Sequence, residues 1–211
     1  MRKTIAILSS ENLVHNIRKI RDLSHNKLIM AVVKANAYGH GIRSTALRIE
    51  KYADSFGVAS IEEALALRQV GIKNPIILME GIFEPDELLI ASCQNFQVVF
   101  HHPIQLGWLK GLSVPLPLSA WIKIDTGLGR LGFSINDAHH ALNSLRNCQH
   151  IKQPIGLMSQ LSCADNPDHY LNEIQLQLFN DLAKNWEGPK SLANSATAFA
   201  FPDAQYDVIR P

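Results

Sequence analysis

Short apolar stretches rich in β-branched residues recur along the 211-residue chain, and segments with helical character separate most of them. The stretches are continuously apolar rather than alternating, which is typical of strands covered on both faces in a parallel sheet. We expect eight strands, at Met30–Val33, Ser55–Ala59, Pro75–Met79, Phe96–Phe100, Ala120–Ile124, Ile155–Met158, Ser191–Ala193 and Asp207–Ile209.

Among the segments between these strands, Ser60–Gly71 has the clearest helical pattern. We expect Ser60 to be the N-cap, Glu63 to complete a capping box and Gly71 to end the helix. Further helices are expected at Asn12–Leu23, Pro85–Cys93, Ile135–Arg146 and Leu171–Trp186.

The repeated strand–helix order predicts the α/β class. With right-handed crossovers, eight such strands close most economically into a (β/α)8 barrel of the TIM type, although a doubly wound open sheet would give the same local signals. A complete barrel takes roughly 250 residues. We therefore expect residues 1–211 to form one barrel domain that is incomplete at its C-terminal end and lacks the last helix.

Charge and composition narrow the classes of function. The chain has 20 Lys and Arg against 19 Asp and Glu, and neither sign forms a long run, so a nucleic acid partner is not expected. The basic opening of residues 1–8 contains an apolar run too short for a signal peptide or a membrane span. The three widely spaced cysteines, Cys93, Cys148 and Cys163, indicate neither a disulfide framework nor a zinc site, and they favour a cytoplasmic setting.

Functional groups in a parallel barrel lie at the C-terminal ends of the strands, so reactive residues that follow an apolar stretch are candidates. Lys34 closes the first expected strand, and Tyr38, Gly39 and Gly41 follow it. A lysine at this place either extends its ammonium group to solvent or is desolvated, and a desolvated amine is a candidate nucleophile. The glycines and the tyrosine hydroxyl favour the functional interpretation, because together they would suit a phosphate group.

Two further regions carry candidate groups. After the fifth strand, Lys123 precedes a glycine-rich stretch and Arg130, whose guanidinium offers a planar fork of donors. Asn194 and Ser195 follow the seventh strand and Arg210 ends the eighth, in the region where this fold often binds phosphate. Taken alone, Arg130 could be an ordinary surface arginine, and Asn194 with Ser195 could form a plain turn or helix cap.

The pairs His101–His102 and His139–His140 invite a metal-site interpretation. No carboxylate–histidine spacing accompanies them, and adjacent side chains point in different directions on a helix or a strand. We expect solvated surface histidines and no metal site.

Four blocks of the sequence resemble the alanine racemase family. Ala31–Gly41 is similar to the segment that carries the cofactor lysine in that family, and this match is long and specific. Lys123–Gly132, Ser162–Asp165 and Ser191–Ser195 through Arg210–Pro211 fit the family in the same order. The resemblance covers essentially the whole chain.

The resemblance implies a pyridoxal 5'-phosphate enzyme that interconverts L-alanine and D-alanine, supplying D-alanine for the peptidoglycan of the cell wall. Lys34 would bind the cofactor covalently and act as the base on one face of the substrate α-carbon. Tyr38 and Ser195 would bind the cofactor phosphate, and Asn194 would also bind the cofactor. Arg210 would face the pyridine nitrogen and leave it unprotonated, because an arginine does not give up its proton.

The resemblance also assigns supporting roles. Arg130 would reach the substrate carboxylate, and the lysine that matches Lys123 is often carbamylated in the family to brace that arginine. Where the family usually has a histidine after the sixth strand, this chain has Gln160, which can form hydrogen bonds but cannot carry a proton.

A second departure concerns the length. The family continues past the segment that matches Arg210–Pro211 into a β-rich domain, which supplies a tyrosine as the opposite base across a homodimer interface. We therefore expect the 211-residue chain to be inactive on its own. Two other interpretations stay open, a single-domain pyridoxal-phosphate carrier and a non-functional remnant, although barrel-only carriers lack a stretch like Ala37–Gly41.

Overall fold

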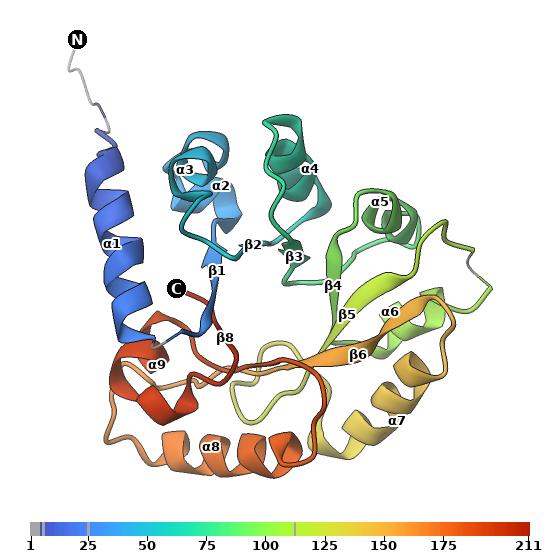
Figure 1. Cartoon of the computed structure of the whole chain (residues 1–211). Helices are drawn as coiled ribbons and strands as arrows, with labels where there is room; N and C mark the ends of the chain where they lie inside the picture. The colour runs from blue at the N-terminus through green and yellow to red at the C-terminus, as the bar shows by residue number, and fades with distance from the viewer. Residues whose placement is uncertain (1–4, 6, 25, 112) are drawn as a thin grey trace.

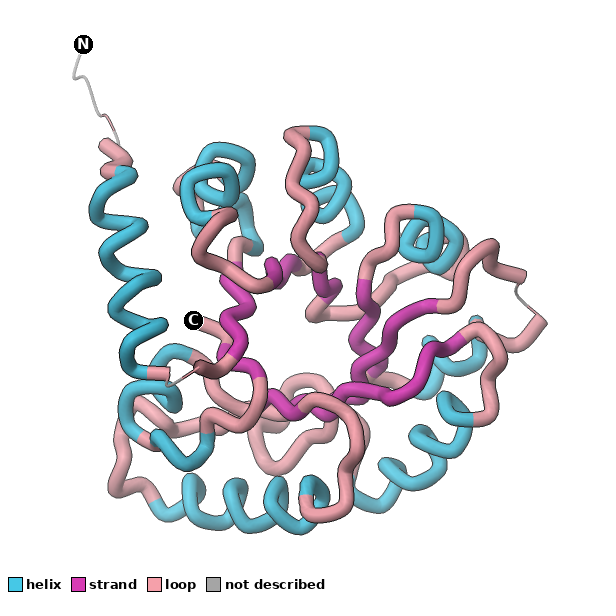
Figure 2. Tube along the Cα trace, in the orientation of Figure 1, coloured by secondary structure: helices cyan, strands magenta, loops and turns pink. Residues whose placement is uncertain are grey.

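The eight expected strands are present and form one parallel sheet in the order β7-β6-β5-β4-β3-β2-β1-β8. The computed structural model describes residues 5, 7–24, 26–111 and 113–211. Figure 2 shows the strands as a central ring with the helices outside it. The strands are β1 (Leu28–Val32), β2 (Ser55–Val58), β3 (Ile76–Leu78), β4 (Gln97–Phe100), β5 (Leu118–Lys123), β6 (Ile151–Met158), β7 (Lys190–Ser191) and β8 (Val208–Ile209).

The sheet closes on itself, which confirms the barrel and excludes the open doubly wound sheet. β8 pairs with β1 in parallel, with Leu28 opposite Val208. β7 and β8 share no regular ladder, but an isolated bridge joins Asn194 to Arg210, and the Arg210 N–H donates to the Ala193 carbonyl at 2.9 Å. The seam between the seventh and eighth strands is therefore held by a few individual bonds.

All five expected helices are present, with ends that differ from the prediction by a few residues. Shorter helices that the sequence patterns did not indicate lie at the C-terminal ends of strands β1, β4 and β7. The helices are α1 (Ser10–Leu23), α2 (Lys34–Tyr38), α3 (Ile42–Ile49), α4 (Ile61–Gln69), α5 (Glu87–Cys93), α6 (Pro103–Trp108), α7 (Ile135–Arg146), α8 (Tyr170–Ala183), α9 (Ser195–Ala200) and the 3-10 turn η1 (Pro202–Ala204).

The predicted capping box at the start of α4 is wrong. Ser60 is the N-cap, but its side chain makes no capping hydrogen bond. The Glu63 carboxylate instead accepts from the Ala59 N–H at 2.9 Å and from the Asn36 N–H at 3.1 Å. Glu63 therefore ties α4 to the turn that follows β1. Gly71 does follow the helix end, with φ of +91°.

Helix α1 precedes β1 and lies beside α3 at the edge of the ring in Figure 1. It packs Ile17 into the core, and Gln205 donates to the Leu23 carbonyl at 3.3 Å. Among the described residues, β8 is the last helix or strand. Residues 1–4 and 6, which hold most of the basic opening considered above, lie outside the described residues. Within the described part of the chain, no helix is both long and apolar enough to cross a membrane.

The inside of the barrel is filled by side chains. A buried cluster inside the ring is separate from the larger core between sheet and helices. Trp121 takes up the most room in it, and a Cβ at Gly156 would lie 2.3 Å from the indole ring. Glycine in β6 thus makes space for the tryptophan in β5. The cluster consists of Met30, Ile77, Val99, Trp121, Met158 and Val208.

Polar side chains at the mouth of the barrel continue the rows that fill its interior. Lys123 lies two residues after Trp121, and Arg210 lies two residues after Val208. Alternate residues of a strand share a face, so both cations point inward at the C-terminal end. His101 likewise lies two residues after Val99 of the interior cluster, so it belongs to the same inward-facing row. The strand period therefore decides which groups reach the mouth.

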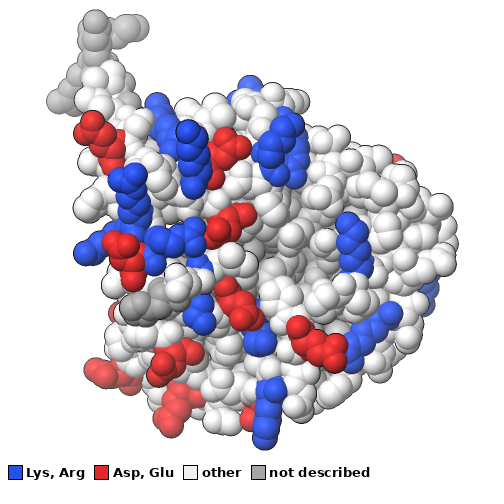
Figure 3. Space-filling model, in the orientation of Figure 1, with Lys and Arg blue, Asp and Glu red and all other residues white. Residues whose placement is uncertain are grey.

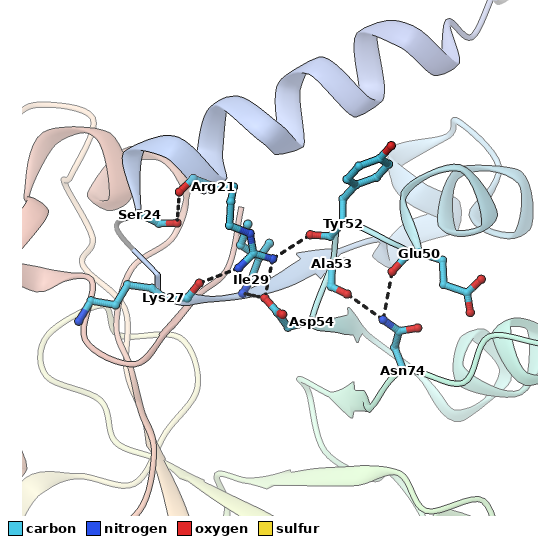
Figure 4. A network of polar contacts seen from close by, with 9 residues as sticks. All are labelled: Arg21, Ser24, Lys27, Ile29, Glu50, Tyr52, Ala53, Asp54 and Asn74. Carbon is cyan, nitrogen blue, oxygen red and sulfur yellow. Dashed lines mark hydrogen bonds and ion pairs between the residues drawn. The ribbon is translucent and has the colours of Figure 1, made fainter.

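A polar network at the opposite, N-terminal end fixes the first strands (Figure 4). Asp54 accepts from Arg21 Nη2 and from the Ile29 N–H, both at 2.7 Å. Arg21 also donates to the carbonyls of Lys27 and Tyr52, at 3.0 and 2.9 Å. One ion pair thus joins α1 to the starts of β1 and β2.

We expect Asp54→Ala to lower the free energy of unfolding by about 1–3 kcal/mol, because the Ile29 amide and the Arg21 guanidinium lose their shared acceptor. Urea unfolding followed by circular dichroism measures the change. Asp203→Ala removes an exposed carboxylate and is the control, which should stay close to the original chain. Equal stability of the two variants would contradict the role of this network.

Candidate active site

One cavity of about 710 Å³ at the C-terminal mouth of the barrel contains every site residue that the sequence indicated. Its volume lies in the range of small-molecule sites. Another cavity of about 910 Å³ lies outside the barrel between α6 and α7 and is lined by none of these residues. The predicted residues lining the mouth cavity are Lys34, Tyr38, Lys123, Arg130, Gln160, Asn194, Ser195 and Arg210.

The segment after Lys34 is a left-handed turn. Ala35, Asn36, Ala37 and Tyr38 have φ values between 51° and 55°. Non-glycine residues pay roughly 1–2 kcal/mol each for this conformation. Asn36 offsets part of that cost, because its Oδ1 accepts from the Ile42 N–H at 2.9 Å and its N–H donates to Glu63. The turn leaves Tyr38 61% exposed beside the cavity.

Lys34 forms an ion pair that the sequence analysis missed. Its Nζ lies 2.8 Å from Oε1 of Glu80, the second residue after β3. Lys34 follows β1, so the two groups meet across β2. The rule that reactive residues follow apolar strands would also have identified Glu80, which comes directly after the expected strand Pro75–Met79.

Arg210 lies inside the barrel and is 3% exposed. Its Nη1 donates to Ser191 Oγ at 2.6 Å, and its Nη2 donates to the carbonyls of Ser159 and Leu192 at 2.7 and 3.2 Å. Burial and the nearby Arg130 lower the pKa of Arg210 to about 10, so it stays charged at neutral pH. A charged donor group is therefore held in a fixed orientation at the floor of the cavity.

Lys123 is 5% exposed and has an unusual pKa. Burial, together with the charges of Arg210, Arg130 and Lys34, lowers that pKa from 10.5 to about 7. The negative charge of Glu80 opposes this shift. A large fraction of Lys123 is therefore neutral near physiological pH and able to act as a nucleophile.

The loop that carries Arg130 is shaped by Asp125 and three glycines. The Asp125 carboxylate accepts from the N–H groups of Gly127 and Gly129 at 2.8 and 2.9 Å. Gly132 has φ of +135°, and a Cβ there would lie 2.6 Å from the Asp125 nitrogen. The glycine-rich sequence thus folds the loop back on itself and leaves Arg130 exposed at the cavity.

Gln160 lines the cavity, with a buried polar network beside it. Gln175 of α8 donates to the Gln160 carbonyl at 3.2 Å and accepts from the Ser162 hydroxyl at 2.8 Å. The hydroxyls of Thr126 and Ser159 lie 3.0 Å apart, and Gln175 also contacts Thr126. This network braces the loops after β5 and β6, and it was not indicated by the sequence patterns.

Asn194 and Ser195 lie at the start of α9. The Asn194 side chain accepts from the Thr197 N–H at 2.9 Å, so it is a helix N-cap. Ser195 is the first helical residue and is exposed to the cavity. The first N–H groups of a helix have no partner within it, so Ser195 offers a hydroxyl and an amide donor together.

The prediction that His101 is a solvated surface residue is wrong. Its Nε2 lies 2.9 Å from the Glu80 carbonyl oxygen, and burial lowers the pKa of its ring. His102 caps α6, and His139 and His140 are exposed on α7. No group of three or more metal-ligating side chains is found among the described residues.

The charge of the cavity is strongly asymmetric. Among the described residues that line it, there is one carboxylate, Glu80, and there are four basic side chains, those of Lys34, Lys123, Arg130 and Arg210. On the face shown in Figure 3, by contrast, Lys and Arg are mixed with Asp and Glu. A cavity of this kind suits a ligand with several negative charges, such as a phosphate ester together with a carboxylate.

Comparisons with known proteins identify a matching family and similar relatives. Residues 8–211 match the family described as alanine racemase, N-terminal domain. The alanine racemase of Legionella pneumophila (strain Corby) is 41% identical over 210 residues, which cover 100% of this chain and 59% of that protein. The chain thus spans about three fifths of the length of this relative.

Solved structures agree with the sequence comparison. Biosynthetic alanine racemase from Pseudomonas aeruginosa matches with a TM-score of 0.86 and 33% identity, over 94% of this chain and 56% of that one. Alanine racemase from Bartonella henselae, solved with covalently bound pyridoxal phosphate, matches with a TM-score of 0.85 and 25% identity, over 97% of this chain and 60% of that one.

The low pKa of Lys123 predicts a pH-dependent stability. Between pH 7 and 10.5 the unfolded chain binds a proton that the folded chain does not, so the free energy of unfolding should rise with pH in this window. Lys123→Met should remove a slope of up to about 1.4 kcal/mol per pH unit. Urea unfolding at several pH values measures it, with the exposed Lys51→Met as control. Parallel pH curves for the original chain and Lys123→Met would contradict the shift.

Proposed function

Because the chain belongs to the alanine racemase N-terminal domain family, we propose that it forms the cofactor-binding barrel of an enzyme that interconverts L-alanine and D-alanine. The observation that carries this proposal is one cavity that brings the Lys34 amine together with Tyr38, Ser195 and Arg210. A reactive amine, phosphate donors and a fixed cation are the groups that pyridoxal 5'-phosphate requires.

The donor set fits this cofactor. Lys34 would hold it covalently, and Tyr38 and Ser195 would donate hydrogen bonds to its phosphate at the start of α9, with Asn194 capping that helix. Arg210, with its other donors already engaged by main-chain and serine oxygens, would face the ring nitrogen. When bound, the cofactor withdraws electrons from the α-carbon of the amino acid, so that the hydrogen on that carbon becomes acidic.

The chain's own residues supply positioning and proton transfer. The Lys34 amine removes the α-hydrogen from one face of the substrate or returns a proton to it. Arg130, exposed at the cavity mouth, would bind the substrate carboxylate. Gln160 would support the site through hydrogen bonds alone, since an amide does not titrate.

We also propose that Lys123 forms a carbamate that braces Arg130. Its partly neutral amine would attack carbon dioxide and lose a proton, which leaves a carboxylate on Nζ. Arg130 and Arg210 lie close enough to lower the pKa of Lys123, so they would stabilise that negative charge. The modification would replace a buried cation with an anion between two arginines.

Four further features of the protein are proposals that rest on the resemblance. They are a preference for alanine as the substrate, the supply of D-alanine to the cell wall, assembly into a homodimer and a cytoplasmic location. Racemisation needs a proton-transferring group on each face of the α-carbon, and the resemblance assigns the second one to a tyrosine of a partner subunit. Lys34 by itself is one half of such a pair.

We expect pyridoxal phosphate and borohydride to label Lys34, because its side chain is 29% exposed while the residue Lys123 is 5% exposed. Proteolysis and mass spectrometry locate the label. Lys34→Arg, which keeps the charge but does not form the covalent bond, should abolish it. A label on Lys123 in the unchanged protein would refute the assignment.

We expect the 211-residue chain alone to form D-alanine from L-alanine no faster than free pyridoxal phosphate does. The physical reason is the single base on one side of the α-carbon. A coupled assay with D-amino-acid oxidase detects the product. Turnover well above the free-cofactor background would show that the chain contains both proton-transferring groups.

A further inference from the structure

Glu80 is the one carboxylate among the described residues that line the cavity, and the proposed function gives it no role. Its Oε1 accepts a hydrogen bond from Lys34 Nζ at 2.8 Å. The two side chains are 33% and 29% exposed, so the pair is reached by water but is partly shielded by the barrel mouth. Glu80 therefore contacts the group that the proposed chemistry depends on.

The main chain around Glu80 is fixed from behind. The His101 ring contacts the Glu80 carbonyl oxygen at 2.9 Å. The buried Gln105 of α6 accepts from the His101 N–H at 2.9 Å and donates to the Ile82 carbonyl at 3.1 Å. Gly81 has φ of +72°, and a Cβ there would lie 2.5 Å from a neighbouring carbonyl oxygen. The Glu80 side chain thus starts from a rigid point, and the fold itself directs it toward Lys34.

Among the described residues that line the cavity, Glu80 is the one negative group beside Lys34. The cations beside it disfavour a further positive charge, because like charges in a partly desolvated site repel. His101 adds little charge near neutral pH, since burial lowers its pKa. The other charged or titratable groups that line the cavity among the described residues are Lys123, Arg130, Arg210 and Tyr38, and His101 contacts the Glu80 carbonyl.

We propose that Glu80 is a positioning residue for Lys34, which holds the free amine in place and stabilises the ammonium that forms when Lys34 takes a proton from the substrate. This role rests on the proposed function. In that step the bond between the α-carbon and its hydrogen breaks and an N–H bond forms on Lys34. The electron pair stays with the substrate carbon, and Glu80 accepts a hydrogen bond without taking the proton.

An ion pair that is fully screened by solvent would behave differently. Such exposed pairs contribute little to stability, and removal of one partner leaves the acid–base behaviour of the other almost unchanged. The proposed role instead predicts that the pH range in which Lys34 is reactive depends on the charge at position 80. This dependence can be measured without cofactor.

Trinitrobenzenesulfonate is a suitable probe, because it reacts with neutral amines. The protein is labelled at a series of pH values, and peptide mapping quantifies the Lys34 product. We expect Glu80→Gln to shift the pH midpoint of labelling downward by about 0.5–1 unit, since the ammonium loses its counter-charge. Glu80→Asp keeps the charge and should stay close to the original midpoint. Glu84→Gln makes the same exchange at an exposed position and is the matched control.

An unshifted midpoint in folded Glu80→Gln would overturn the proposal. Circular dichroism and thermal unfolding verify the fold of each variant. If the glutamine variant does not fold, Glu80→Ala asks the same question, and an unshifted midpoint there has the same force. A shift in Glu84→Gln as large as in Glu80→Gln would also overturn it, because the effect would then be a general one.

The reaction with pyridoxal phosphate and borohydride tests the proposed function separately. A cofactor label on a lysine other than Lys34 in the unchanged protein refutes that function, and with it the role of Glu80 in catalysis. A cofactor label on Lys34 together with an unshifted trinitrobenzenesulfonate midpoint refutes only the role of Glu80. The two failures are thus distinguishable.

Discussion

The buried guanidinium of Arg210 constrains the mouth of the barrel more than any other group. A cation removed from water must have its donors satisfied, or the folded state is strongly destabilised. Here the acceptors are Ser191 Oγ and the carbonyls of Ser159 and Leu192, so the ends of β6 and β7 converge on a residue that follows β8. This convergence occurs at the seam where the strand ladder is interrupted. Arg210 thus closes the barrel and at the same time presents a fixed positive charge to the cavity.

That fixed charge determines the state of the groups around it. Burial, together with that charge, lowers the pKa of Lys123 to about 7, so the two buried basic residues do not both carry a full charge near neutral pH. Lys34 differs from Lys123 because it has a carboxylate, Glu80, at 2.8 Å. The two lysines of one cavity thus lie in different electrostatic surroundings, Lys123 near two arginines and Lys34 against a carboxylate.

The sequence predicted the eight strands from apolar runs, and eight of the residues that line the cavity lie together because parallel strands bring their C-terminal ends together. It failed where a residue's partner is distant in the chain. Glu63 has the spacing of a capping box, but the amide of Asn36 competes for its carboxylate. His101 was expected at the surface because no carboxylate–histidine spacing accompanies it and adjacent side chains point apart, whereas the two-residue step from Val99 directs it inward. The ion pair of Glu80 with Lys34 was not predicted because the two residues follow different strands, although Glu80 itself directly follows an expected strand.

The indole of Trp121, packed against Gly156 and surrounded by the other side chains of the cluster, plugs the middle of the barrel. The interior beneath the cavity is therefore filled by side chains rather than left as a pore. Under the proposed function, substrate and product would both pass through the mouth at the C-terminal ends of the strands. Any group that covered this mouth would therefore affect arrival and release together.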